Sequence, residues 1–326
     1  MVYPPPERIA LMIRLLFLLT AITLHAADRP ALIVVNGTPG TKAYADQFSQ
    51  WTTAWKQAAQ RGGYSVENLQ RPDAGTQLAG LQKLVAAYNK PVTSPLWLVL
   101  IGHGTFDGKK AKFNLHGPDL DADTLGQWLK PLKRPLVIIN CTASSAPFIS
   151  ALSGPNRVII TATRSGFEQN FSHFGGHLAK AIGDPTADLD KDGQTSLLEA
   201  WLIANRNTAA FYKNENRLAT EHSLLDDNAD AKGTPADWFR GLQVIRKPED
   251  AKLLPDGLRA HQLHLIPSPQ ERALTSALRA QRDQLELQLA KLRAQKEELN
   301  DQEYYPKLET LLRKLGAIYF QGQSNL

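Results

Sequence analysis

Four short apolar runs, separated by segments with helical periodicity, constrain this chain more than any other feature of its sequence. They occupy residues 31–35, 96–101, 136–139 and 158–162. Apolar runs of this length are typical of strands that are buried on both faces, and the helical segments between them supply the crossovers that a parallel sheet needs. The sequence therefore predicts an α/β fold in three layers: an open, mostly parallel sheet with helices on both faces.

The first residues have the pattern of a signal for export. Arg8 and Arg14 precede an apolar run at 15–24, and small residues follow at 26–27. The run is about half the roughly 20 residues that a membrane-spanning helix needs, so a cleaved signal peptide over residues 1–27 is favoured over an uncleaved anchor. We therefore expect a mature chain that is periplasmic or secreted and has no stable membrane span.

The chain has one cysteine, Cys141, among its 326 residues. It can form no intramolecular disulfide and build no cysteine-rich zinc site. In an exported protein, an unpaired cysteine more often indicates a functional thiol or an intermolecular bond than it does in the cytosol. The alternative is a small core residue that is packed beneath the helix after its strand.

Two of the predicted strands end in residues that can carry nucleophilic chemistry. The strand at 96–101 runs into His103 and Gly104. The strand at 136–139 runs into Cys141. If the two strands are neighbours, a thiolate nucleophile and an imidazole acid–base meet at one edge of the sheet, and the backbone amides of Gly104 and Cys141 can form an oxyanion hole. The alternative for His103 is a hydrogen-bonded turn histidine.

A hydrophobic strand that ends in His-Gly, followed about forty residues later by one that ends in Cys, resembles the caspase/legumain-like (clan CD) cysteine peptidases. The resemblance runs from Leu32 to about Gly233. It implies a caspase-like, six-stranded open sheet, endopeptidase activity and a catalytic domain at 28–245. Gly102 stands where legumains have Asp, and Ile-Asn at 139–140 stands where they have Glu-Ala.

The same resemblance places Lys42 and Glu168 on the segments that shape the first specificity pocket in this family. The two residues indicate a peptide or protein substrate with a polar or charged side chain. One acid and one base do not decide the sign of that charge.

The segment at 188–199 has the spacing of a calcium-binding loop, D-x-D-x-D-G-x5-E. Calcium prefers oxygen ligands, and the candidates here are Asp188, Asp190, Asp192, Gln194 through its backbone carbonyl, and Glu199. Thr195 stands where paired EF-hands carry an aliphatic residue, so we expect a single loop with a structural ion. The alternative is an acidic turn whose aspartates cap the next helix.

A second, poorer acidic run contains Asp226, Asn228 and Asp230. Ala231 replaces the glycine of the calcium-loop pattern, and Pro235 interrupts the segment. The sequence therefore predicts a solvated turn here.

The last part of the chain changes in composition. Several prolines within 246–270 indicate a linker, and 271–326 predict a coiled-coil-like helical hairpin with a break near Asn300 and Pro306 at the start of its second helix. Three roles stay open for the hairpin: packing on the domain or on itself, dimerisation, or a removable propeptide. Legumains carry a helical C-terminal pro-segment, so the resemblance implies self-inhibition in the last case.

Two functions follow. The first is an exported cysteine endopeptidase with Cys141 as nucleophile and His103 as acid–base, stabilised by calcium and without an organic cofactor, because the sequence lacks a glycine-rich phosphate loop. The second is a catalytically silent caspase-like binding or scaffold protein that forms a homo-oligomer through 271–326. A formal net charge of +5 gives no concentrated footprint for nucleic acid.

Overall fold

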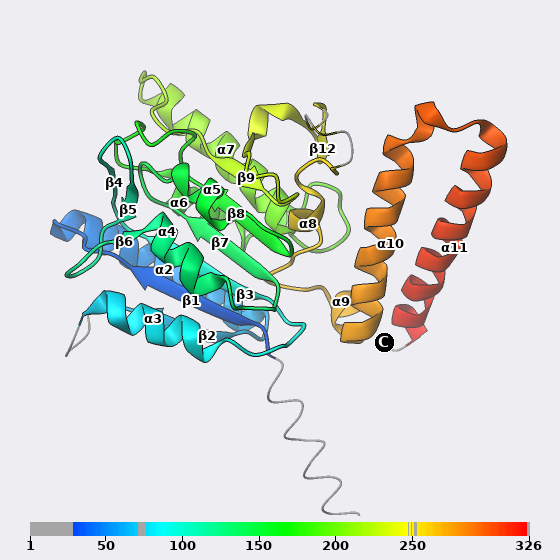
Figure 1. The fold of residues 1–326 in the computed structure, drawn as a ribbon, viewed down its shortest axis with the longest axis horizontal. Coiled ribbons are helices and arrows are strands. Elements are labelled where there is room, and N and C mark those ends of the chain that lie inside the picture. Colours follow the sequence, from blue (N-terminus) through cyan, green and yellow to red (C-terminus); the bar gives the residue numbers. More distant parts are fainter. Residues whose placement is uncertain (1–28, 71–75, 247, 249, 251–252, 325–326) are drawn as a thin grey trace, which may run out of the picture.

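The centre of the molecule is a seven-stranded sheet with the strand order β10-β9-β8-β7-β3-β1-β2 (Figure 1). The computed structural model describes residues 29–70, 76–246, 248, 250 and 253–324, so the predicted signal peptide lies outside the described residues. The strands are β1 (Ala31–Asn36), β2 (Ser65–Leu69), β3 (Leu96–Ile101), β7 (Leu136–Asn140), β8 (Arg157–Thr161), β9 (Leu224–Asp226) and β10 (Thr234–Pro235).

Most of the sheet is parallel, as predicted. Strands β2, β1, β3, β7 and β8 run in the same direction, and β9 and β10 add an antiparallel edge. The resemblance implied six strands, and the short β10 is one more. It pairs with β9 over two residues only, a length too short to leave a periodic signal in the sequence.

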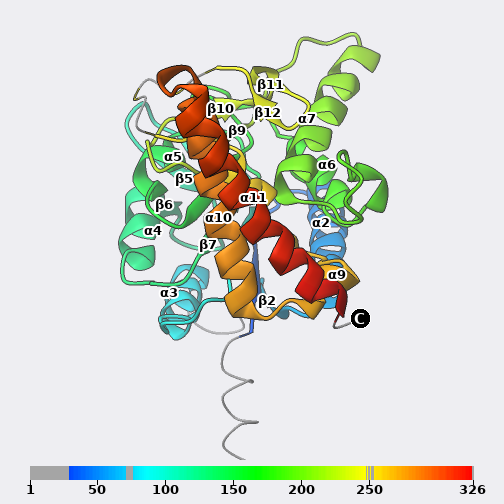
Figure 2. The ribbon, with the colours of Figure 1, turned by 90° about the vertical axis from the view of Figure 1, so that its right-hand side faces the viewer.

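Helices cover both faces of the sheet (Figures 1 and 2). One face carries α2 (Lys42–Arg61), α6 (Phe174–Ala181) and α7 (Leu197–Asn214). The other carries α3 (Gln77–Ala87), α4 (Ala122–Leu129) and α5 (Pro147–Leu152). Because side chains alternate along a strand, Ile139 faces the first layer and Ile138 the second, which explains the unbroken apolar runs. The predicted fold class is confirmed.

A small antiparallel sheet follows β3 and lies beside the edge where the parallel strands end. It consists of β4 (Gly104–Phe106), β5 (Ala111–Phe113) and β6 (Leu120–Asp121). A short two-stranded ribbon of β11 (Phe239–Arg240) and β12 (Gln243–Val244) lies further along the chain. These strands are too short to be predicted from hydrophobic periodicity.

Part of the segment predicted as a linker contributes to the core of the domain. Helix α8 (Leu258–His261) buries Ala260, and Leu265 is buried in the same apolar cluster. A Cβ on Gly62 would lie 1.8 Å from the carbonyl oxygen of Leu265, so the segment touches the backbone at the end of α2. The chain around Ala260 and Leu265 is therefore packed on the domain.

The C-terminal helices form the predicted hairpin, which lies beside the edge of the sheet where the parallel strands begin (Figures 1 and 2). They are α10 (Ser276–Ala294) and α11 (Asp301–Ser324), and the short α9 (Pro269–Ala273) precedes them. Their leucines pack against one another in a separate apolar cluster. Pro306 lies inside α11, not at its start as predicted, because the Asn300 side chain caps the helix by accepting from the Glu303 amide.

Polar contacts join the hairpin to the domain. The Gln262 side chain donates to the Asp283 carbonyl (3.0 Å) and to the Glu286 carboxylate (2.9 Å). Within the C-terminal helices, the buried Arg282 of α10 pairs with Glu271 of α9 and with its neighbour Asp283. The Arg272 side chain of α9 donates to the Arg61 carbonyl at the end of α2 (2.9 Å). The hairpin is therefore held against the side of the domain that is remote from the carboxyl ends of the strands.

His264, next to this junction, should make the protein sensitive to acid. Burial, followed by the charge of Arg282, lowers its pKa to about 3. A histidine with a depressed pKa stabilises the fold fully above its unfolded pKa of about 6.5, and this stabilisation is lost as the pH falls below that value. Between pH 7 and pH 5 we expect the free energy of unfolding to fall by about 1–2 kcal/mol more in the native protein than in His264→Gln. Urea unfolding of both proteins at each pH measures this difference, and equal losses would contradict it.

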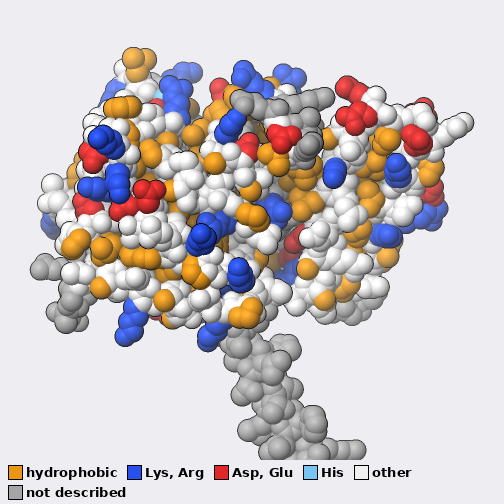
Figure 3. All heavy atoms as spheres, viewed as in Figure 1, with side chains coloured by type: hydrophobic (Ala, Val, Ile, Leu, Met, Phe, Trp, Pro, Cys, Tyr) orange, Lys and Arg blue, Asp and Glu red, His pale blue; other side chains and the backbone are white. Residues whose placement is uncertain are grey.

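None of the described helices is long and apolar enough to span a membrane. On the face of the molecule in Figure 3, Lys and Arg side chains are interspersed with Asp and Glu, without a continuous basic stripe.

Candidate active site

The candidate site lies where the parallel strands end. Strands β3 and β7 are direct neighbours, with Leu100 opposite Asn140, and the Cys141 amide donates to the Leu100 carbonyl (3.0 Å). His103 and Cys141 therefore follow adjacent strands at one edge of the sheet, as the sequence analysis expected.

The Cys141 side chain is buried beneath helix α6. The residue is 1% exposed and belongs to the apolar cluster between the sheet and α2, α6 and α7. A Cβ on Gly175 of α6 would lie 2.6 Å from the Cys141 Cβ and 3.1 Å from its sulfur, so only a glycine fits above the thiol. Burial, helped by the negative charge of Glu221, raises the pKa of Cys141 to about 12. The thiol is therefore protonated at neutral pH and covered by a helix.

The His103 ring is surrounded by aromatic side chains. Its centroid lies 4.8 Å from that of Tyr44, 5.4 Å from Phe48 and 5.7 Å from Phe171. Its Nε2 atom lies 3.1 Å from the carbonyl oxygen of Pro39. A carbonyl can only accept, so Nε2 carries the hydrogen in this contact.

The segment after Cys141 is buried, and its hydroxyls contact side chains near the ends of β7 and β8. The hydroxyl of Thr142 donates to Asn140 Oδ1 (2.7 Å), and the Ser145 hydroxyl lies 3.2 Å from that of Thr163. A Cβ on Gly104 would lie 2.1 Å from the Ala143 carbonyl oxygen, so glycine is required where the chain after β3 crosses this segment. Thr142, Ser144 and Ser145 are all buried.

Solved structures with a similar fold include two caspases. The chain is similar to caspase-1 from Spodoptera frugiperda, with a TM-score of 0.41, 8% identity and coverage of 62% of this chain and 87% of that one. For the Drosophila initiator caspase Dronc the TM-score is 0.42 and the identity 15%, over 63% of this chain and 82% of that one. For Raptor from Chaetomium thermophilum the TM-score is 0.35 and the identity 8%, over 49% of this chain and 18% of that one.

The likeness to these solved structures concerns the fold alone. No known family profile matches the sequence, and no curated protein sequence matches it.

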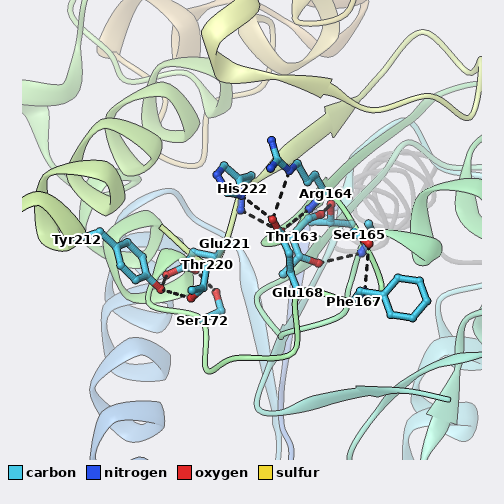
Figure 4. A network of polar contacts seen from close by, with 12 residues as sticks. Thr163, Arg164, Ser165, Phe167, Glu168, Ser172, Tyr212, Thr220, Glu221 and His222 are labelled. Atoms are coloured by element: carbon cyan, nitrogen blue, oxygen red, sulfur yellow. Dashed lines mark hydrogen bonds and ion pairs between the residues drawn. The ribbon is translucent and has the colours of Figure 1, made fainter. Parts of the chain in front are cut away.

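The two residues predicted to shape a specificity pocket already have partners in the chain. Glu168 holds the turn after β8 to the segment before β9: one of its oxygens lies 2.5 Å from His222 Nδ1, and the other accepts from the Arg164 amide (2.9 Å; Figure 4). Lys42 is exposed at the start of α2 and pairs with Asp46 (2.7 Å).

Glu221, which the sequence analysis missed, is the most heavily bonded acid near the site. It is 4% exposed, and its carboxylate accepts from the Ser172 hydroxyl (2.5 Å), the His173 and Phe174 amides (2.8 and 3.0 Å) and the Tyr212 hydroxyl (3.0 Å; Figure 4). Glu221 thereby caps the N-terminus of α6, the helix that covers Cys141. No local pattern marks it, because its partners come from two other parts of the chain.

The acidic loop at 188–194 gathers three of its predicted ligands. Carboxylate oxygens of Asp188, Asp190 and Asp192 lie within 4.8 Å of one another and could hold a metal ion. The Glu199 carboxylate accepts from the Ser196 amide and hydroxyl (both 2.8 Å) in a capping box at the start of α7. The Gln194 side chain accepts from the Ser268 amide (3.0 Å).

Proposed function

We propose that this chain uses its caspase-like fold to bind a peptide segment and that Cys141 is a core residue, not a nucleophile. The observation that carries this proposal is the burial of the thiol beneath Gly175, with a pKa of about 12. A thiol attacks as the thiolate, and burial in apolar surroundings suppresses that form. The hydroxyls that follow Cys141 are buried as well, so they offer a substrate no alternative nucleophile.

The proposed binding surface lies on the loops beyond the carboxyl ends of β3 and β8. Phe167 is 74% exposed, and its ring packs edge-on against Phe106 at 5.2 Å. The Arg164 side chain is exposed on the same turn, where it pairs with Glu168 (3.4 Å), and Lys109 and Lys110 are exposed in the turn that follows Phe106. An aromatic platform bordered by basic side chains fits a peptide that carries acidic and aromatic residues.

Fluorescence anisotropy tests this surface. A labelled peptide that contains Glu, Asp and Phe should bind the full chain, and the same peptide with Lys in place of its acids should not. Phe167→Ala and Arg164→Glu should each weaken binding at least about tenfold, or about 1.4 kcal/mol. The exposed change Lys83→Ala, on α3, is the control and should have no effect. Equal binding of the acidic peptide and its Lys-substituted counterpart would contradict the proposal.

An exported cysteine endopeptidase is the second candidate, and the adjacency of β3 and β7 favours it. It requires α6 to move away from Cys141 before His103 and the thiol can act together. Labelling with a peptidyl electrophile separates the two candidates. Labelling that needs both Cys141 and His103, tested with Cys141→Ala and His103→Ala, would support the peptidase. Absence of labelling in the native chain would support the binding protein.

The loop at 188–194 is proposed to bind calcium as a structural ion. We expect calcium at about 100 times its Kd to stabilise the protein by about 2.7 kcal/mol, which corresponds to a rise of about 5–10 °C in Tm relative to the EGTA-treated protein. Asp192→Ala should remove most of this shift because it deletes one of the gathered carboxylates. Asp123→Asn, an exposed change outside the loop, should keep it. An equal shift in Asp192→Ala would contradict the assignment.

Export and assembly complete the proposal. N-terminal sequencing of the mature protein tests cleavage near residue 27.

Leu312 and Tyr305 of α11 are exposed, and they support self-association through the C-terminal helices. Light scattering of the full chain and of Leu312→Glu tests this self-association. A dimer that the substitution dissociates would support it, and a monomeric mass for both proteins would contradict it.

A further inference from the structure

The turn between β9 and β10 repeats the hydrogen bonding of the loop at 188–194. In that loop, the first, third and fifth residues each accept a backbone amide in their own side chain: Asp188 from Lys191, Asp190 from Asp192, and Asp192 from Gln194. In the turn at 226–232 the side chains at the same positions also accept backbone amides. Asp226 accepts from Ala229 (3.2 Å), Asn228 from Asp230 (2.9 Å) and Asp230 from Lys232 (2.8 Å). The two segments thus have the same side-chain register.

The backbones of the two segments also agree. The fourth and sixth residues have positive φ in both: 63° at Lys191 and 92° at Gly193 in the first, 70° at Ala229 and 62° at Ala231 in the second. Ala231 therefore takes the conformation that normally calls for glycine. The expectation of a solvated turn rests on the missing glycine and on Pro235. Ala231 adopts the glycine conformation here, and Pro235 lies beyond the turn, in β10.

A buried carboxylate oxygen gives a second, independent indication of a ligand. Asp226 is 1% exposed, and its Oδ2 atom has no hydrogen-bond partner within the described part of the chain. The equivalent oxygen of Asp188 accepts from the Gly193 amide (3.1 Å), whereas the Ala231 amide donates to the Ser153 hydroxyl instead (3.0 Å). Because Oδ1 of Asp226 accepts from Ala229 within the turn, the carboxylate is directed into the turn. A bound cation would supply the missing partner.

The turn is held in place from outside. Asp256 accepts from the amides of Asp227 and Asn228 (2.8 and 3.1 Å) and from the Thr234 hydroxyl (2.6 Å). Asp227 in turn accepts from the Gly257 amide (2.9 Å). These contacts fix the backbone of the turn, and none of them uses a side-chain oxygen of Asp226, Asn228 or Asp230.

We propose that the turn at 226–232 is a second cation-binding loop that takes a hard divalent ion, Ca²⁺, through Asp226, Asn228 and Asp230. All three side chains offer oxygen, which Ca²⁺ prefers and which a soft metal does not. With two carboxylates and one amide, the loop has a lower ligand charge than the loop at 188–194. Its expected Kd is roughly 10⁻⁴–10⁻³ M, the range of weak extracellular sites.

Equilibrium dialysis of the EGTA-treated full chain against radioactive Ca²⁺ tests the second loop separately from the first. In the Asp192→Ala background, which disables the first loop, we expect one ion per chain. Adding Asp230→Asn or Asn228→Ala should weaken that binding at least tenfold, and adding Asp237→Asn, an exposed change outside the turn, should leave it intact. This design works whether or not the loop at 188–194 binds calcium.

Hydrogen exchange of the native chain covers the case in which a variant does not fold. In the native chain, Ca²⁺ should slow exchange of the amides at 226–234 at least tenfold. The proposal is overturned if Asp192→Ala binds no Ca²⁺ up to about 10 mM, ten times the upper expected Kd. It is also overturned if folded Asp230→Asn and Asn228→Ala bind as well as their parent.

Discussion

Native Cys141 is expected to react with iodoacetamide at pH 7.5 at least about 1,000-fold more slowly than in the urea-unfolded chain. Burial raises the pKa of the thiol from 9.0 to about 12, which lowers the thiolate fraction about tenfold per unit. The helix above Gly175 adds a steric barrier. Mass spectrometry of a single modified site measures both rates, because the chain has no other cysteine.

The pH dependence of the alkylation rate shows whether Cys141 reacts slowly because its thiolate is suppressed or because the reagent cannot reach it. In the unfolded chain the rate should level off above about pH 9, whereas in the native chain it should keep rising toward pH 11. The control is Gln169→Cys in a Cys141→Ala background, whose exposed thiol should react at the unfolded rate. A native Cys141 that reacts within tenfold of the unfolded rate, and slows in His103→Ala, would favour the peptidase.

The sequence predicts the sheet well because buried parallel strands have a simple signature. The four apolar runs became β1, β3, β7 and β8. The sequence left open whether the strands before His103 and Cys141 are neighbours, and the pairing of β3 with β7 shows that they are. The same signature hides the orientation of Cys141. In a strand that is apolar on both faces, the pattern does not show which side a residue faces or whether a helix covers it.

Long-range contacts account for the other differences. Glu221 caps α6 from 47 positions away in the sequence, and Leu265 joins a core whose members extend back to Leu32, so neither leaves a local pattern. In the turn at 226–232, an alanine adopts a glycine conformation because Asp256 and Ser153 hold the segment. A prediction from residue type alone fails at such a position, because tertiary contacts stabilise a backbone conformation that the residue rarely adopts.

Glu221→Ala is expected to lower the free energy of unfolding by about 4 kcal/mol, since it leaves four donors, three of them in buried contacts, without their charged acceptor. Two of those donors are amides at the N-terminus of α6, where a negative charge also interacts favourably with the helix dipole. Ser172→Ala removes a single donor and should cost only about 1 kcal/mol. Urea unfolding measures both values, and a loss below about 1 kcal/mol in Glu221→Ala would contradict the prediction.

The same substitution links the stability of α6 to the chemistry of Cys141. Glu221 raises the pKa of the thiol and holds the helix that covers it, so its loss should both lower that pKa and loosen the cover. We expect Glu221→Ala to speed alkylation of Cys141 at pH 7.5 at least tenfold, under conditions where most of the protein is still folded. Glu221→Gln removes the charge but keeps a side chain of the same size, so its alkylation rate should lie between those of the native protein and Glu221→Ala. If the thiol gains reactivity and still cleaves no peptide, covering by α6 is not what keeps Cys141 inactive, and a binding role is favoured over a latent peptidase.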